Sequence, residues 1–202
     1  MIVHNGGRVS RRYLQHVGQE WIEEHKEEAR LGELLRVDND YLSQAFDFFE
    51  LMGSLLCQEC WRLFAREEQA DRGSAFCAHQ YDCLVEAKWT VAEGLGSWSK
   101  EGELAEADSL IGRINHWLSI KRQGRWSEIE AEVTTFDYGV LNLRYVAALH
   151  ALAERRDSFF SVLSDARLLE DELKHWPIFE EMRQDPRFGE FLSKMRSVTE
   201  SE

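Results

Sequence analysis

The chain has 202 residues, of which 44% are hydrophobic, 30% are charged and two are proline. This size suits a single domain over residues 1–202, and no apolar run approaches the ~18–20 residues that a membrane span needs. A net charge of −13 opposes nucleic-acid binding, which requires cations to replace phosphate counterions. The N-terminus lacks the apolar stretch of a secretory signal, so we expect a cytoplasmic protein.

The N-terminal region is predicted to contain a mobile start and one amphipathic helix. We expect residues 1–8 to be flexible and residues 12–36 to form the helix. Its apolar side would carry Leu14, Val17, Trp21, Ile22, Leu31, Leu34 and Leu35, and its wet side Glu23, Glu24, Glu27 and Glu28. The run Asp38-Asn39-Asp40 is an N-cap cluster, which predicts that a second helix follows it.

That second helix, residues 41–64, is the most apolar segment of the chain. Its large side chains surround more than one face, which is typical of a central helix packed on several sides. A partner helix is predicted from Gly73-Ser74 to a stop at residues 94–96. The two would form a long antiparallel hairpin, made either within one chain or across a homodimer.

The middle of the chain predicts two further helices. The first covers residues 103–121 and ends at Gln123-Gly124. The second begins at Ser127, where Ser127 and Glu130 have the spacing of a capping box. It is expected to break near Thr134-Thr135, before another helix over residues 142–155. No stretch alternates cleanly with a period of two, so a sheet is not expected.

The C-terminal stretch reads WPIFEEMRQDPRFGEFLSKM over residues 176–195. Asp185-Pro186 is an N-cap followed by a first-turn proline. After it, Phe188, Phe191, Leu192 and Met195 recur at helical spacing and predict a short helix with one apolar stripe. Residues 197–202 are expected to fray.

The helical pair before this stretch has a recognisable order. Tyr145, Ala148 and Leu149 precede the turn at residues 155–157, and Phe159, Phe160, Leu163 and Ala166 follow it. Together with the Asp-Pro-Arg-Phe helix, residues 142–196 resemble the last repeat of tetratricopeptide-like proteins. The resemblance implies a helical array with a closing unit. We therefore predict an all-α fold of seven to eight helices in stacked antiparallel hairpins with a tetratricopeptide-like end.

Four cysteines and one histidine make up the best metal candidate: Cys57, Cys60, Cys77, His79 and Cys83. Thiolate and imidazole groups are the usual zinc ligands. However, the Cys-x-x-Cys pair falls inside a predicted apolar helix, whereas zinc sites usually hold such a pair in a tight knuckle. Free cysteines are often buried, so core thiols are the favoured interpretation, with zinc and a disulfide as alternatives. We predict no metal and no cofactor.

No catalytic set emerges from the sequence. Arg11 and His16 have the Arg-x4-His spacing of helical HEPN-type ribonucleases, which makes such an enzyme an alternative function. Glu172 and His175 form the single Glu-x-x-His of the chain, although a helical di-iron site needs two. The motifs of phosphate-binding loops, nucleophile elbows and zinc proteases do not occur.

Two tryptophans are the predicted interface anchors, because both stand near glycines at expected helix connections with acidic neighbours. These groups are Trp98 with Glu101, Glu103 and Glu106, and Trp126 with Glu128, Glu130 and Glu132. The leading hypothesis is a non-enzymatic protein-binding protein, most concretely an acidic immunity protein or antitoxin that neutralises a basic toxin. The alternatives are a peptide-binding scaffold or adaptor and a HEPN-like ribonuclease.

Overall fold

The computed structural model describes residues 8–16, 30–34, 39–139 and 141–199. Within these ranges the chain is all-α, as predicted, with ten α-helices, three short 3-10 helices and one isolated antiparallel bridge between Arg8 and Leu34. Every helix among the described residues is too short or too polar to span a bilayer. The chain divides into two compact units, residues 1–46 and 47–202.

The first unit holds α1 (Arg11–His16) and the start of α3 (Asn39–Phe64). Arg8 donates to the carbonyl oxygen of Gly32 at 2.8 Å, and Gly32 has a positive φ of 89°. The helix predicted over residues 12–36 is therefore wrong at its end, because a turn occupies residues 31–32. Residues 1–7, Asp38 and the segment with Val17, Trp21, Ile22 and the four glutamates lie outside the described part.

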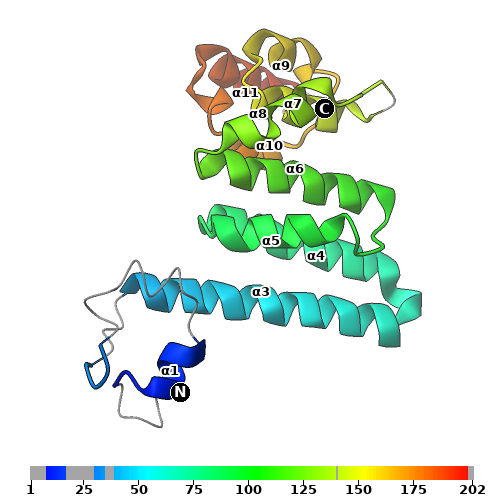
Figure 1. Cartoon of the computed structure of the whole chain (residues 1–202). Helices are drawn as coiled ribbons and strands as arrows, with labels where there is room; N and C mark the ends of the chain where they lie inside the picture. Colours follow the sequence, from blue (N-terminus) through cyan, green and yellow to red (C-terminus); the bar gives the residue numbers. More distant parts are fainter. Residues whose placement is uncertain (1–7, 17–29, 35–38, 140, 200–202) are drawn as a thin grey trace. The chain divides into compact units, whose positions relative to one another are not determined.

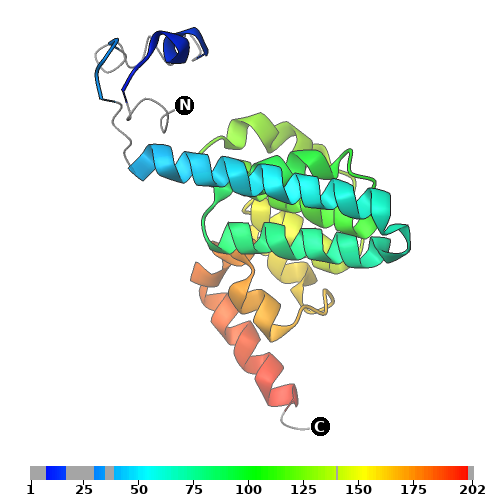
Figure 2. The same cartoon turned by 90° about the horizontal axis from the view of Figure 1, so that it is seen from below.

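The second unit is built of successive helical layers (Figure 1). It begins with residues 47–64 of α3, and a 3-10 turn at Arg66–Glu68 joins α3 to α4 (Gln69–Val85). Helices α5 (Trp89–Ser99) and α6 (Glu106–Arg122) follow. The predicted partner of α3 is thus two helices, which separate where Ala87 adopts a positive φ of 58°. Figure 2 shows α3 and α4 running side by side.

The glycines that were expected to end this partner helix lie inside α5 and permit close packing instead. A Cβ on Gly96 would lie 2.3 Å from the Cβ of His116 on α6. A Cβ on Gly94 would lie 2.5 Å from a methyl carbon of Leu51 on α3. The absence of side chains therefore brings α5 close to both neighbours, and α5 continues to Ser99.

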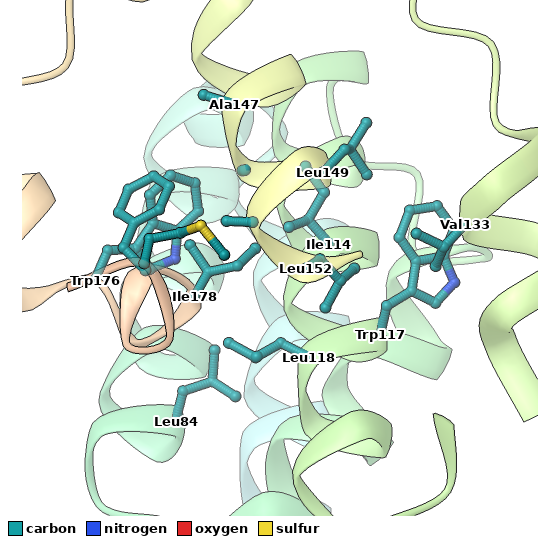
Figure 3. Close-up of a cluster of buried hydrophobic side chains, with 14 of the residues drawn as sticks. Leu84, Ile114, Trp117, Leu118, Val133, Ala147, Leu149, Leu152, Trp176 and Ile178 are labelled. Carbon is teal, nitrogen blue, oxygen red and sulfur yellow. The ribbon is translucent and has the colours of Figure 1, made fainter. Parts of the chain in front are cut away.

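The buried core is centred on α6, which corresponds to the helix predicted over residues 103–121. Ile114, Trp117 and Leu118 are at most 1% exposed and meet side chains from the layers on either side (Figure 3). Helices α4, α5, α7 and α8 all pack against α6. The central position that the sequence predicted for residues 41–64 thus belongs to α6.

The remaining helices close the second unit. They are α7 (Trp126–Thr135), α8 (Leu143–Leu152), α9 (Arg156–Leu163), α10 (Glu170–His175), two 3-10 turns (Pro177–Phe179 and Met182–Gln184) and α11 (Pro186–Thr199). The predicted cap of α11 is confirmed, because Asp185 accepts a hydrogen bond from the backbone N–H of Arg187 at 3.0 Å. The capping box at Ser127 is wrong, since α7 begins at Trp126 without a side-chain cap. Helix α11 runs to Thr199, into the tail predicted to fray.

Candidate functional site

Trp98, the first predicted anchor, is half-buried inside α5 and engaged with its own unit. Its ring packs against Phe76 with 5.4 Å between the ring centroids, and the guanidinium of Arg72 lies 5.8 Å from the indole centroid. Its Nε1–H donates to Glu59 on α3 at 3.3 Å. Trp98 therefore links α3 to α4 and the core. The neighbouring acids Glu101, Glu103 and Glu106 are exposed.

Trp126, the second predicted anchor, is the half-buried first residue of α7, and the ammonium of Lys121 lies 5.4 Å from its indole centroid. Of its acidic neighbours, Glu128 pairs with Arg125 at 3.2 Å. Glu132 accepts hydrogen bonds from Arg113 and from Nε1 of the buried Trp117. Glu130 is exposed. Part of this acidic group is thus engaged in intramolecular pairing.

The residues of the two catalytic patterns considered from the sequence lie in separate surroundings where the structure describes them. Arg11 is exposed on α1, and the side chain of His16 lies outside the described residues. Glu172 accepts from the backbone N–H of Leu169 at 2.9 Å and pairs with Arg144, while His175 pairs with Asp171 at 3.5 Å. Glu172 and His175 are therefore engaged separately.

The four cysteines are free thiols in different environments. Cys57 and Cys60 are exposed on α3, so the prediction of core thiols is wrong for this pair. Cys77 is half-buried on α4, directs its Sγ to the carbonyl oxygen of Asp108 at 3.6 Å, and has a pKa raised to about 12 by burial and by Asp108. Cys83 is buried on α4. The disulfide alternative is not realised.

A cluster of possible metal ligands joins α3 to α4. Glu50, His79 and Cys83 each offer one atom within 4.8 Å of the other two, and no other group of three or more such side chains occurs among the described residues. Lys88 contacts Glu50 at 3.0 Å, and Ser54 Oγ lies 2.9 Å from Nε2 of His79. Burial and the Glu50 carboxylate raise the pKa of the Cys83 thiol to about 12. His79 and Cys83 belong to the metal candidate predicted from the sequence, whereas Glu50 does not.

Helix α3 exposes a continuous apolar surface, which we call the outer face of α3. Exposed fractions reach 69% at Phe49, 66% at Leu56 and 83% at Phe64. The outer face consists of Phe49, Met52, Gly53, Leu56, Cys57, Cys60, Leu63 and Phe64. These positions recur every three or four residues, so they share one side of the helix. Helical spacing alone cannot reveal whether such a side faces the core or the solvent.

The opposite side of α3 holds it to the rest of the second unit. Among the 26 described residues of α3, Gln58 alone is buried. Leu51 and Leu55 pack against the core, and Glu50 and Glu59 bond to Lys88 and Trp98. The expectation that this helix is packed on several sides is therefore wrong. A shallow depression beside the outer face is lined by Phe49, Glu50, Gly53, Ser54, Cys57, Gln58 and His79.

Comparison with known proteins gives one local similarity. Residues 54–79 match a family model described as a zinc finger found in FPG and IleRS. No curated protein and no solved structure matches the chain. The matched segment contains Cys57, Cys60, Cys77 and His79, but here it consists of the end of α3, a 3-10 turn and the start of α4. Those four side chains do not form a ligand group in the described structure.

Proposed function

We propose that this chain is a non-enzymatic protein-binding protein and that its partner docks on the outer face of α3. The observation that carries the proposal is the exposure of Phe49, Leu56 and Phe64, each at least 66% exposed, on one side of a single helix. Isolated exposed apolar residues are ordinary, but a contiguous apolar patch is typical of an interaction site.

The size of the outer face supports a specific interface. An aromatic side chain buries roughly 150–250 Å² when fully covered, so the exposed parts of the outer face offer on the order of 600 Å². A standard interface buries about 800 Å² per partner. Helix α3 would thus supply most of the contact area, and adjoining polar residues would supply the rim.

The charge of the chain indicates the chemistry of the partner. A net charge of −13 speeds the approach of a basic protein and opposes that of an acidic one. A straight helical stripe fits an amphipathic helix, whose apolar positions recur with the same spacing. We propose an amphipathic helix of a basic protein as the occupant. The concrete form of this proposal is an immunity protein or antitoxin that neutralises a basic toxin.

Native mass spectrometry tests this proposal on untagged protein purified from cells that carry the neighbouring genes. We expect a basic polypeptide at fixed stoichiometry, retained by wild type and lost from Leu56→Glu. The matched control is Leu169→Glu, because Leu169 is 67% exposed just before α10 and Leu56 is 66% exposed. Loss from both variants would contradict the proposed site. If wild type shows the mass of two chains and Leu56→Glu shows the mass of one, the occupant is a second copy of this chain.

A second candidate, a peptide-binding adaptor, is favoured by a cleft among α4, α6 and α10. Cys77, Ala78, Tyr81, Ile111, Asn115, Asp171, Glu172 and Trp176 line it. Asn115 is 1% exposed and its Oδ1 has no hydrogen-bond partner, so it offers an acceptor to a peptide N–H. The resemblance of residues 142–196 to a tetratricopeptide-like ending favours the same idea. Selection from a random peptide library tests it, with Ile111→Glu expected to abolish binding that Leu56→Glu leaves intact.

A further inference from the structure

We infer that Glu50, His79 and Cys83 form a binding site for a zinc ion between α3 and α4. The inference does not depend on the proposed protein-binding function. It rests on the positions of three ligand atoms that belong to two neighbouring helices of the second unit. Carboxylate oxygen, imidazole nitrogen and thiolate sulfur are all established zinc ligands.

The distances among the three atoms suit a zinc ion. His79 Nε2 lies 3.9 Å from Glu50 Oε1, Cys83 Sγ lies 3.8 Å from the same oxygen, and Cys83 Sγ lies 3.9 Å from His79 Nε2. These separations form a nearly equilateral triangle. Its centre lies roughly 2.2 Å from each corner (the edge divided by √3), within the range of zinc bonds to oxygen, nitrogen and sulfur, about 2.0–2.3 Å. Small side-chain movements would therefore complete the coordination.

The helices place these side chains before any ion arrives. His79 and Cys83 are four residues apart on α4, which puts them one turn apart on the same side of the helix, the spacing of paired zinc ligands in metalloprotease helices. Glu50 projects from α3 toward both of them. Sites on rigid helices hold their ligands more precisely than sites on loops.

The surroundings supply an outer shell and an open side. Lys88 Nζ lies 3.0 Å from Oε2 and 3.3 Å from Oε1 of Glu50, so an ion on Oε1 would displace the ammonium from that oxygen. Lys88 can then orient the carboxylate through Oε2. Ser54 Oγ, now 2.9 Å from His79 Nε2, would give up that hydrogen bond to the metal. The depression next to the triangle contains Cys57. A water molecule or the Cys57 thiolate can reach the fourth position from there.

The proposed site differs from the one that the zinc-finger similarity implies. A zinc finger over residues 54–79 would use Cys57, Cys60, Cys77 and His79, so Cys60 would be essential and Cys83 irrelevant. The site on α3 and α4 reverses these roles. Cys60 is an exposed thiol outside the triangle, and Cys83 is one of its corners.

The test measures zinc content by plasma mass spectrometry after dialysis of the full chain, followed by cobalt titration of the metal-free protein. We expect one zinc per chain and a thiolate-to-cobalt charge-transfer band in the wild type. The variants Cys83→Ala and His79→Gln should weaken metal binding at least tenfold. The control Cys60→Ser should bind as wild type does. Circular dichroism would verify that each variant is folded.

Two variants guard against misinterpretation. His79 is half-exposed, so His79→Gln can fold even if Cys83→Ala, in a buried position, does not. Cys57→Ser decides whether the fourth ligand is a thiolate, since its loss would then remove part of the charge-transfer intensity. Failure of the wild type to bind either metal would overturn the inference. The inference would also be overturned if Cys60→Ser abolished metal binding while His79→Gln or Cys83→Ala left it unchanged.

Discussion

Helices α3 and α6 are buried to the opposite degree from what their compositions suggest. Helix α3 carries more large apolar side chains than α6, yet Gln58 is the one buried residue among its described positions. Helix α6 has eight buried residues, including the polar Asn115, His116 and Ser119. The difference teaches that burial depends on how many neighbours surround a helix. An apolar helix at the end of a stack keeps one side in water.

The contacts of the two helices explain this contrast. Four other helices pack against α6, and Nδ1 of its buried His116 bonds to the carbonyl oxygen of Glu93 on α5 at 3.0 Å. By contrast, α3 is held on one side by two leucines and a few polar bonds. We therefore expect α6 to determine stability and α3 to determine binding.

The largest expected difference in the free energy of unfolding is between truncation of an aromatic residue in α6 and in α3. Trp117 on α6 is fully buried, so Trp117→Ala should lower the free energy of unfolding by about 3–5 kcal/mol. Phe49 on α3 is 69% exposed, and Phe49→Ala should change it by less than about 0.5 kcal/mol. Urea unfolding of the isolated chain measures both. A loss of similar size for Phe49→Ala would mean that the chain covers its own α3.

A smaller difference in stability is expected between glycine-to-alanine substitutions in α5 and α3. In Gly96→Ala the new methyl group would overlap His116, so we expect a loss of about 1–3 kcal/mol. Among the described residues, apart from the chain neighbours and the local backbone of α3, no atom lies within 4 Å of a Cβ built on Gly53. An alanine there should stabilise α3 by about 0.5–1 kcal/mol. Thermal unfolding of the two variants measures the opposite signs. Destabilisation by Gly53→Ala would reveal a neighbour packed on the outer face.

The smallest effect concerns pH and the buried His116 of α6. Burial lowers the pKa of His116 below its usual 6.5, assisted by Lys100 and opposed by Glu93 and Glu132. In the window between the lowered pKa and 6.5 the unfolded chain binds more protons than the folded chain, so stability decreases as pH falls below about 6.5. In His116→Gln this decrease should be shallower. Urea midpoints at a series of pH values measure the slope, and an unchanged slope would contradict the assignment.

The sequence predicted the parts of the fold that local chemistry controls. The all-α class, the helix that became α6, the end of α7 near Thr134-Thr135 and the Asp185 cap follow from helical spacing, propensity and capping, and all are confirmed. The helix end predicted at Gly94 and Gly96 is wrong, because a glycine can mark a close approach of two helices as readily as a helix end.

The candidate sites depend on tertiary arrangement, which local patterns do not contain. The outer face of α3 has the same spacing as a core-facing stripe, so its exposure could not be predicted from residues 49–64. Glu50 lies near His79 and Cys83 only because α3 lies beside α4. No sequence motif connects Glu50 with His79 and Cys83. Both members of the predicted cysteine pair are exposed on α3, where Cys57 lines the depression beside this triangle and Cys60 does not.

Hydrogen exchange of the chain with and without its bound partner is the most direct test of the central claim. We predict that binding slows exchange of the α3 amides over residues 49–64, while the segments around Trp98 and Trp126 exchange as before. Slower exchange around Trp98 or Trp126, with α3 unchanged, would contradict the assignment of the binding surface to α3.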